Sequence, residues 1–508
     1  MPAPPSVHSR HRGGSPTPLT SAAHSVHVSA LPRRPFATPI ACNGKENGVQ
    51  STPTQLRAQF ALRLSALYGR EVPAYTTLLD VTASINAETM RTNGADAERF
   101  GSIDRVTAER HGAIRVGNAR EMSQVALIFG AMGMYPVGFY DLRDTASSSI
   151  PVVSTAFRPI DPAELAINPF RIFTSMLVAS DRRFFDQDLG RRLTEFLDRR
   201  TLFPPLLLEL AATCERDNGL AAEESATFLD LATAAFALST DPVDRAWYRE
   251  LEAVSAVAAD IGGVSSTHIN HLTPRVLDID LLHRRMGERG VAMIDTIQGP
   301  PRTSGPGLLL RQTSFRALDE QRMFLDENGN VEPGHLRVRF GEVEARGAAA
   351  TALGRRRYDE YLDRLDTEEP EDASALWSSL VPDDETQWMA EDLAYFTFRV
   401  TGTNPSAADR DGGLVDLVRS GVLAADPIVY EDFLPKSAAG IFRSNLESDG
   451  TRNSDNTAAA FDAEAMESVL GRTLHDPYRI YGRLRDESVA RVEKHLGLTK
   501  PLDCPWTH

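Results

Sequence analysis

Hydrophobic residues recur at helical spacing over residues 55–86, which predicts one or two helices at the start of the folded part of the chain. Residues 111–117 then alternate as a strand does. Asn118, followed three residues later by Glu121, is typical of a capping box, so we expect a helix over about 118–131. The pattern next predicts three strands, at 135–142, 152–160 and 170–178. The first module is therefore one strand, one helix and three strands.

Residues 180–260 have helical periodicity throughout, and a second set of strands follows them. This second set is expected to begin with a strand at His268 and to continue with a helix over about 278–288. Its remaining strands are expected at 308–315, 323–326 and 336–344. The order of elements resembles that of the first module.

A sequence echo supports a duplication. His111-Gly-Ala-Ile-Arg115-Val matches His271-Leu-Thr-Pro-Arg-Val, and Thr-Ala-Phe157-Arg matches Thr-Ser-Phe315-Arg. The separation from His111 to Phe157 is 46 residues, and that from His271 to Phe315 is 44 residues. Two matches at nearly equal separation indicate a repeated module. The echo pairs His111 with His271 and leaves His268 outside the pair.

The fold class that we predict is α+β, with paired βαβββ modules, a large helical insertion and helical C-terminal elaborations. Beyond the second module we expect a helix at 348–365, an exposed acidic connection at 367–385, strands at 393–400 and 427–433, a polar loop at 446–457 and two closing helices. The expected boundaries are an extension (1–52) and a folded domain (53–508), which holds module one (about 105–178), the insertion (about 180–260), module two (about 265–345) and the C-terminal elaboration (about 346–508).

The first 52 residues are rich in Pro, Ser, Ala and His and lack a core pattern. The first 45 contain five basic residues and no acidic residue. This composition is typical of an organellar transit peptide, and it equally suits a disordered tail or a start codon placed too early. Both interpretations stay open at this point.

Composition narrows the class of protein. The 508 residues are 42% hydrophobic and 24% charged, as in ordinary globular proteins, and the net charge of −16 disfavours binding to nucleic acid or to an anionic membrane. The three cysteines, Cys42, Cys214 and Cys504, form no Cys-x-x-Cys pair, and no apolar run approaches the roughly 18 residues of a membrane span. We expect a soluble, intracellular, cytoplasmic protein, or a plastid or mitochondrial one if the extension is a transit peptide.

Residues 336–344 carry apolar side chains on one strand face and then Glu342 and Glu344 on that same face. An acidic residue that follows apolar residues on one strand face is either a buried functional group or lies where the end of the strand emerges into water. Glu342 lies nearer the apolar part, so we expect it to be the buried one.

His111, His271 and Glu342 together suggest a facial triad of two histidines and one carboxylate. Imidazole and carboxylate ligands suit Fe(II), and three ligands on one face leave positions for a substrate and O2. The alternative is that each histidine is an ordinary core or surface residue of a strand. Arg115 shares a strand face with His111, about 13 Å along the strand, and could bind a ligand carboxylate; the alternative is an ion pair with one of the many acids.

Five motifs in order resemble those of the 2-oxoadipate dioxygenase/decarboxylase family, also called 2-hydroxyglutarate synthases. They are Glu-Arg-His111-Gly-Ala-Ile-Arg115-Val-Gly, His-Ile-Asn-His271-Leu-Thr-Pro-Arg, Leu-Arg-Gln-Thr-Ser-Phe315, Arg-Phe-Gly-Glu342-Val-Glu-Ala-Arg-Gly and Tyr-Glu-Asp-Phe-Leu-Pro-Lys436-Ser-Ala-Ala-Gly-Ile-Phe. The resemblance extends from about Gln55 to the last helices. It implies the vicinal-oxygen-chelate fold, whose paired βαβββ modules agree with the duplication.

The resemblance also implies a function. It implies Fe(II) held by His111, His271 and Glu342, with the two histidines, Arg115 and the residue at Lys436 contacting the substrate. Arg115 would be the catalytic side chain outside the ligand set, selecting a distal carboxylate. The family carries an apolar residue at Lys436, so contact through Ser437 or through the backbone stays open.

The implied reaction converts 2-oxoadipate, a small 2-oxo diacid, and O2 to 2-hydroxyglutarate and CO2, a step of lysine breakdown, which would make 53–508 a catalytic domain. The alternatives are an enzyme of the same fold that acts on another 2-oxo acid, and a non-catalytic binding protein. The oligomeric state stays open.

Overall fold

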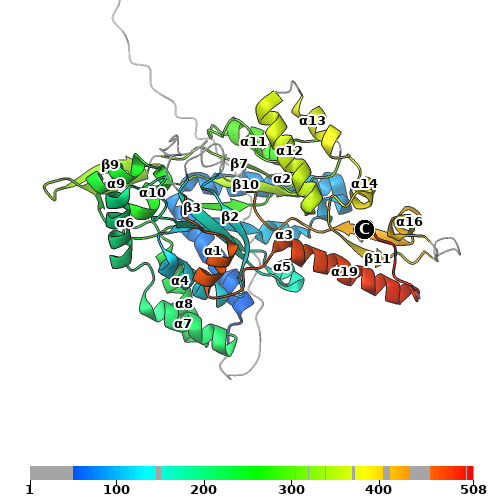
Figure 1. Ribbon diagram of the computed structural model, residues 1–508, viewed down its shortest axis with the longest axis horizontal. Helices are drawn as coiled ribbons and strands as arrows, with labels where there is room; N and C mark the ends of the chain where they lie inside the picture. Colours follow the sequence, from blue (N-terminus) through cyan, green and yellow to red (C-terminus); the bar gives the residue numbers. More distant parts are fainter. Residues whose placement is uncertain are drawn as a thin grey trace, which may run out of the picture. The chain divides into compact units, whose positions relative to one another are not determined.

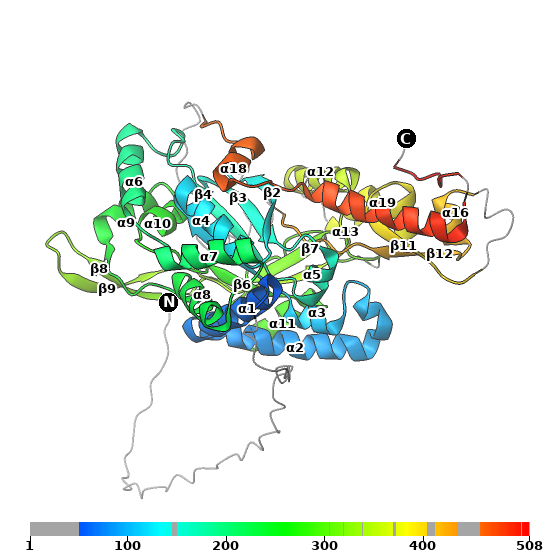
Figure 2. The same ribbon diagram turned by 90° about the horizontal axis from the view of Figure 1, so that it is seen from below.

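The computed structural model describes residues 50–144, 150–303, 305–318, 320–337, 339–368, 372–403, 412–434, 458–498 and 500–506, all within one unit that spans Gly48–His508. This part begins with two long helices, α1 (Pro53–Glu71) and α2 (Pro73–Asn93), as the pattern predicted. Thr52 and Gln55 form a capping box at the start of α1. Helix α1 packs beside α8 (Ala222–Ala235), and α2 packs beside α11 (Ile279–Glu288) (Figure 2).

The largest sheet lies near the middle of this unit (Figure 1). Its strand order is β2-β3-β4-β1-β6, in which β1 is parallel to β4 and every other neighbouring pair is antiparallel. The strands are β1 (Arg110–Val116), β2 (Tyr135–Asp141), β3 (Val152–Arg158), β4 (Arg171–Leu177) and β6 (His271–Pro274). Helix α4 (Ala119–Gly130) follows β1, and Asn118 caps it by accepting a hydrogen bond from the Glu121 amide. The predicted strand, helix and three strands of module one are therefore confirmed.

The second module continues from β6. Strand β10 (Glu342–Arg346) pairs with β7 (Leu310–Ser314), and a bridge between Arg275 and Glu344 connects β6 to β10. Residues 292–298 run beside β7, where the Ile294 amide donates to the Ser314 carbonyl at 3.0 Å. The order β7-β10-β6 thus repeats the order β3-β4-β1. Phe157 in β3 and Phe315 directly after β7 occupy equivalent places, as the sequence echo requires.

The prediction of one continuous strand over residues 336–344 is wrong. The chain leaves its strand after Leu336, and the next strand begins at Glu342. Between them, the Phe340 carbonyl accepts a hydrogen bond from the Tyr68 hydroxyl at 2.7 Å. Gly341 then passes so close to the Phe315 ring that a Cβ there would lie 1.8 Å from it. A small separate sheet results from strands β5 (Val243–Asp244), β8 (Glu320–Leu325) and β9 (Val331–Leu336).

The helices expected between the modules are present. They are α6 (Gln187–Arg199), α7 (Pro205–Asp217), α8, α9 (Arg245–Glu252) and α10 (Ala256–Gly262). Of two further short helices, α3 (Ile103–Ala108) precedes β1, and α5 (Pro162–Ile167) lies within the first module, between β3 and β4. None of the described helices has both the length and the apolar composition that crossing a membrane requires.

The C-terminal part corrects two expectations. The connection predicted to be exposed contains α13 (Ala373–Leu380), in which Trp377 packs edge-on against the Tyr361 ring at 5.3 Å in a buried cluster. The last strand among the described residues is β12 (Leu423–Pro427), which pairs with β11 (Phe396–Val400) and ends where a strand over 427–433 was predicted to begin. The other helices here are α12 (Ala352–Glu368), α14 (Glu385–Ala390), α16 (Leu414–Arg419), α18 (Ala463–Leu470) and α19 (Pro477–Leu496). The polar loop expected at 446–457 lies outside the described residues.

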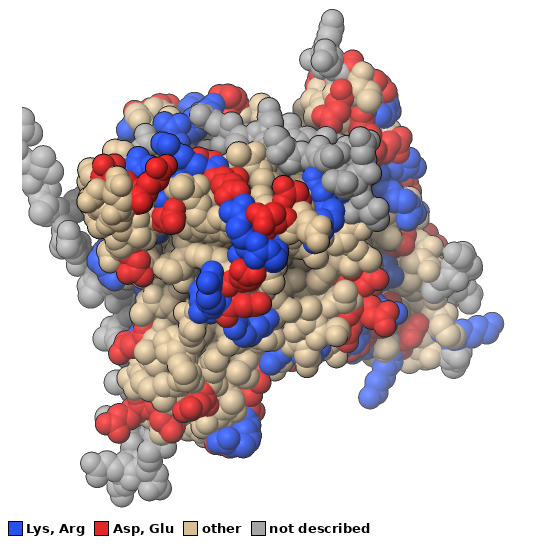
Figure 3. Space-filling model, turned by 60° about the vertical axis from the view of Figure 1, so that its left-hand side comes forward, with Lys and Arg blue, Asp and Glu red and all other residues tan. Residues whose placement is uncertain are grey.

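One face of the molecule illustrates its surface charge. Acidic and basic side chains are interspersed on this face rather than gathered by sign (Figure 3). Arg192 of α6, for example, pairs with Asp188 and Glu250 at 2.8 Å. Such exposed pairs each stabilise the fold by about 0–1 kcal/mol, so they affect solubility more than folding.

Candidate metal centre

Three predicted ligands meet where the two modules join. His111 is on β1, His271 is the first residue of β6 and Glu342 is the first residue of β10. Because β1 pairs with β6 and a bridge ties β6 to β10, the three strands place these side chains together. One donor atom from each residue lies within 4.8 Å of the others, and each residue is at most 5% exposed. We refer to His111, His271 and Glu342 as the His–His–Glu site.

One nitrogen of the site, His111 Nε2, is poorly satisfied without a cation. His111 Nε2 lies 3.4 Å from Glu342 Oε1 and has no hydrogen bond of good geometry within the described part of the chain. His271 Nδ1 lies 3.4 Å from Glu342 Oε2 and 3.0 Å from the Thr273 hydroxyl. A buried imidazole nitrogen without a partner is unfavourable, and a divalent cation would satisfy it. The residues therefore fit a metal of the kind that prefers imidazole and carboxylate, which includes Fe(II).

Glu344 supports His111 from the other side of the ring. Its Oε2 lies 2.9 Å from His111 Nδ1, which leaves Nε2 for a metal. Burial opposes ionisation of Glu344, but the positive charges of Arg346, then His111 and Arg171, lower its pKa to about 2. Both Glu342 and Glu344 are buried, so the alternative of a strand end emerging into water is wrong.

Arg115 lies on β1 and pairs with Asp260 of α10. Asn270 Nδ2 donates to the same Asp260 oxygen at 3.0 Å and lies 3.1 Å from His268 Nε2. Burial lowers the pKa of His271 most, and the charges of His111 and Arg115 lower it further, so the guanidinium acts electrostatically on the His–His–Glu site. The ion pair that sequence reasoning held as the alternative for Arg115 is present. His268, with its pKa lowered to about 4 by burial, belongs to this Asp260 cluster.

A model of the 2-oxoadipate dioxygenase/decarboxylase family matches residues 60–445 of this chain. The chain belongs to that family. Among its relatives, the 2-oxoadipate dioxygenase/decarboxylase of Mycobacterium bovis is 56% identical over 85% of this chain and 97% of its own length. The Pseudomonas putida protein of the same name is 39% identical over 88% of this chain and 98% of its own length.

The fold agrees with the family assignment. The crystal structure of the Pseudomonas putida hydroxyglutarate synthase in complex with 2-oxoadipate matches this chain with a TM-score of 0.75 and 37% identity. The match covers 89% of this chain and 100% of that one. The predicted fold class, α+β with paired modules, is thereby confirmed.

Aromatic rings enclose the His–His–Glu site of this 2-oxoadipate dioxygenase/decarboxylase family member. The Phe433 ring stands edge-on to His111 at 5.0 Å, and Phe340 stacks on His271 at 5.3 Å. Phe173 lies 5.0 Å from Phe433. These rings give the site apolar walls that limit the access of water.

A buried ionic cluster, which sequence reasoning missed, lies behind the site. Arg171 is at its centre and contacts Glu109 at 2.8 Å, Glu344 at 3.3 Å and Glu431. Four arginines and three glutamates among the described residues make up this cluster: Arg105, Arg171, Arg275, Arg346, Glu109, Glu344 and Glu431. Five of them stand in the motifs quoted above, but their pairing could not be predicted, because segments distant in sequence bring them together: Glu109, Arg275, Glu344, Arg346 and Glu431.

Two predicted substrate contacts of this family member lie outside the described residues. Lys436 and Ser437 follow directly after the described segment 412–434 and Pro435. Arg275, which the sequence echo aligns with Arg115, pairs with Glu109 at 2.9 Å and belongs to the buried ionic cluster.

Proposed function

We propose that this protein is an Fe(II)-dependent dioxygenase/decarboxylase that converts 2-oxoadipate and O2 to 2-hydroxyglutarate and CO2 in lysine breakdown. The observation that carries the proposal is the convergence of His111, His271 and Glu342 in one buried site. The relatives named as 2-oxoadipate dioxygenases/decarboxylases, and the hydroxyglutarate synthase with 2-oxoadipate bound, support the substrate.

His111 Nε2, a nitrogen of His271 and a Glu342 oxygen would hold the metal. Fe(II), when bound, would supply the Lewis acidity that holds a 2-oxo acid and the redox chemistry that activates O2. The protein contributes by fixing the ligands: Glu344 orients the His111 ring, and Gln312 donates a hydrogen bond to Glu342. The apolar rings of Phe340 and Phe433 would keep bulk water away from the oxidising step.

Arg115 would bind the distal carboxylate of the diacid. Its guanidinium is buried and held by Asp260, so little side-chain entropy would be lost when a substrate carboxylate adds to it. Lys436, Ser437 or the backbone at these residues would make a further contact with the substrate.

Oxygen consumption tests the proposed reaction. Purified protein loaded with Fe(II) under anaerobic conditions would be offered 2-oxoadipate, 2-oxoglutarate and an aromatic 2-oxo acid, with O2 uptake and CO2 release measured together. We expect equimolar O2 uptake and CO2 release, fastest with 2-oxoadipate. A preference for another 2-oxo acid of the panel would mean that an enzyme of the same fold acts on a different substrate. No O2 uptake with any of the three acids would contradict the dioxygenase. Protein that contains no iron after anaerobic purification would instead favour a non-catalytic binding protein.

Arg115→Ala is expected to keep its iron and to lose substrate affinity. A hydrogen bond to a charged group contributes about 1.5–3 kcal/mol, so kcat/KM for 2-oxoadipate should fall roughly 10- to 150-fold, mostly through KM. Steady-state O2 uptake measures this, and the matched control is Arg399→Ala, because the Arg399 side chain on β11 is 63% exposed. Kinetics equal to those of the wild type would show that Arg115 does not bind the substrate.

Glu344→Gln is expected to weaken metal binding while leaving the three ligands in place. Removing an outer partner of a ligating histidine typically costs 10- to 100-fold in metal affinity. Competition with a chelator of known affinity would measure the change. An unchanged metal affinity would show that Glu344 does not orient His111.

A further inference from the structure

The two modules contribute unequally to the His–His–Glu site. Each supplies one histidine from its first strand, but the carboxylate comes only from module two, where Glu342 is the first residue of β10. Strand β4 has the same place in module one as β10 has in module two, since each lies between the first strand of its module and an antiparallel neighbour. The residue of β4 that corresponds to Glu342 therefore occupies the position that the duplication would give to a fourth ligand.

The pairing of β4 with the first strand identifies this residue as Phe173. In module one, Ala113, two residues after the ligand of β1, lies beside Phe173 in the parallel pairing of β1 with β4. In module two, Arg275 and Glu344 form a parallel bridge between β6 and β10. By the same register, the residue two places after the ligand of β6 lies beside Glu342.

The antiparallel neighbours of β4 and β10 give the same answer. Phe157 and Phe315 are equivalent in the sequence echo. The residue before Phe157, on β3, pairs with Phe173, and the residue before Phe315, on β7, pairs with Glu342. Because two separate registers agree, Phe173 and Glu342 occupy equivalent positions in the two modules.

The Phe173 side chain is on the side of the sheet that carries the metal ligand of β1. Paired residues of neighbouring strands point to the same side of a sheet, and Ala113 lies between His111 and Arg115 on their side of β1. The Phe173 ring is 5.0 Å from the ring of Phe433, which is itself 5.0 Å from the ring of His111. Phe173 is therefore part of the aromatic wall of the site.

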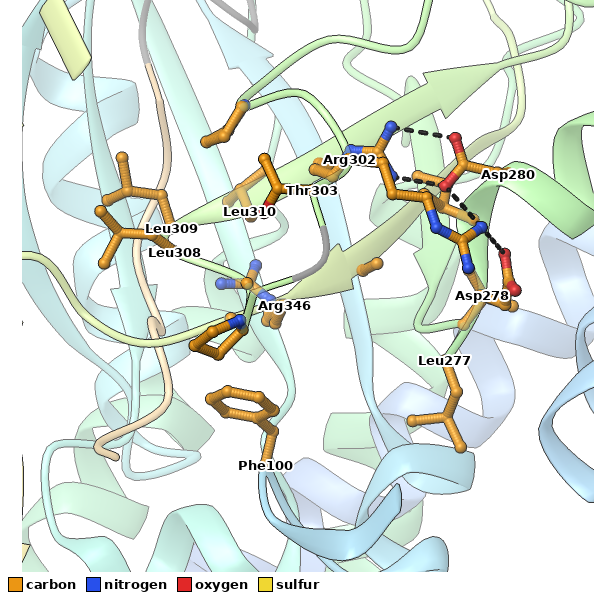
Figure 4. Close-up of a pocket in the computed structure, with 18 of the residues that line it drawn as sticks. Phe100, Leu277, Asp278, Asp280, Arg302, Thr303, Leu308, Leu309, Leu310 and Arg346 are labelled. Atoms are coloured by element: carbon orange, nitrogen blue, oxygen red, sulfur yellow. Dashed lines mark hydrogen bonds and ion pairs between the residues drawn. The ribbon is translucent and has the colours of Figure 1, made fainter. Parts of the chain in front are cut away.

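The far end of β10 does not extend the site. Arg346 there borders a cavity of about 440 Å³, and Arg302, with its ion pairs to Asp278 and Asp280, forms another part of the cavity wall (Figure 4). The residues that line this cavity include neither Phe173 nor any member of the His–His–Glu site. The side of the site that faces module one is thus the one on which a further ligand or a substrate has to be sought.

An aromatic ring at this position has a chemical consequence. Phenylalanine has no atom that can coordinate a metal, whereas a carboxylate at residue 173 would add a ligand and a second negative charge. Metal sites closed by protein ligands are typically structural, and a facial triad leaves positions for substrate and O2. A diacid that reached from the metal to Arg115 would pass Ala113, the residue beside Phe173.

We propose that Phe173 keeps open the coordination position that the duplication would otherwise give to a fourth protein ligand, and that the 2-oxo acid group of the substrate takes this position. The identity of the substrate rests on the proposed function. The equivalence of Phe173 and Glu342 rests only on the fold.

Phe173→Glu tests the proposal through metal affinity. Competition with a chelator of known affinity, with Co(II) as the probe and no substrate present, should show binding at least tenfold tighter than in the wild type. Phe173→Gln is the matched control, because glutamine has the shape of glutamate without its charge, and it should not gain this affinity. Equal Co(II) affinities for the two variants would overturn the proposal.

Substrate binding provides a second measurement. Calorimetric titration of the Co(II)-loaded proteins with 2-oxoadipate in the absence of O2 should show at least tenfold weaker binding to Phe173→Glu than to Phe173→Leu, because the new carboxylate takes the position that leucine leaves open. Equal affinities would mean that the substrate does not use this position and would overturn the proposal.

Phe173→His covers the case in which the buried glutamate prevents folding, because imidazole is a metal ligand that can be buried without charge. It should also bind Co(II) at least tenfold more tightly than the wild type. The control is Tyr140→His, because the Tyr140 ring on β2 packs 5.4 Å from that of Phe173, and it should gain no affinity. No gain in Phe173→His would overturn the proposal. A wild type that binds Co(II) but takes up no O2 would contradict the dioxygenase alone.

Discussion

His271→Ala should lose its iron and its oxygen consumption while keeping its fold. The variant removes one of three ligands, so metal affinity should fall by more than the roughly 10- to 100-fold that loss of an outer partner costs. The alanine side chain leaves space beside Phe340. The fold should be kept, because β6, which begins at residue 271, pairs with β1 through backbone hydrogen bonds that the substitution does not remove. Metal analysis after anaerobic loading, together with O2 uptake, measures both losses.

The matched control for this variant is His283→Ala. His283 is on α11, accepts or donates one hydrogen bond with the Thr313 hydroxyl at 2.9 Å, and lies outside the His–His–Glu site. It should keep iron and activity at the wild-type level. If His271→Ala retained stoichiometric iron and full turnover, the three residues would not be the metal ligands, however close together they lie.

The sequence predicted the His–His–Glu site because its members are marked by local pattern. His111 and His271 begin matching segments, so the echo was sufficient to pair them. Glu342 was found from the alternation of side chains over 336–344, although the structure interrupts that strand between Leu336 and Glu342. The echo holds in three dimensions because β1 and β6 are neighbouring strands and β3 and β7 occupy equivalent positions.

The groups around the site could not be found in this way. Asp260 meets Arg115 only because α10 packs against the first sheet, and Glu431 meets Arg171 across 260 residues of chain. Contacts of this kind depend on tertiary packing and leave no periodicity in the sequence. The break between Leu336 and Glu342 also involves tertiary packing, since Tyr68, from the first helix, donates a hydrogen bond to the Phe340 carbonyl there.

Arg171→Met should be the most destabilising of the single substitutions considered. Arg171 is fully buried on β4 and contacts all three glutamates of the cluster, Glu109, Glu344 and Glu431, so its loss removes one positive partner from each of them. Removing one partner from a buried ion pair typically costs about 3–5 kcal/mol, and methionine restores the volume but none of the charge. The free energy of unfolding, from urea denaturation followed by far-ultraviolet circular dichroism, should fall by about that amount.

Arg275→Met provides the comparison within the same buried ionic cluster. Arg275 contacts a single glutamate, Glu109, which keeps Arg171 at 2.8 Å and Arg346 at 3.3 Å when Arg275 is removed. Its cost in unfolding free energy should therefore be clearly smaller than that of Arg171→Met, which removes a partner from three glutamates. Equal losses from the two variants would mean that the number of glutamates that an arginine contacts does not determine the cost of removing it.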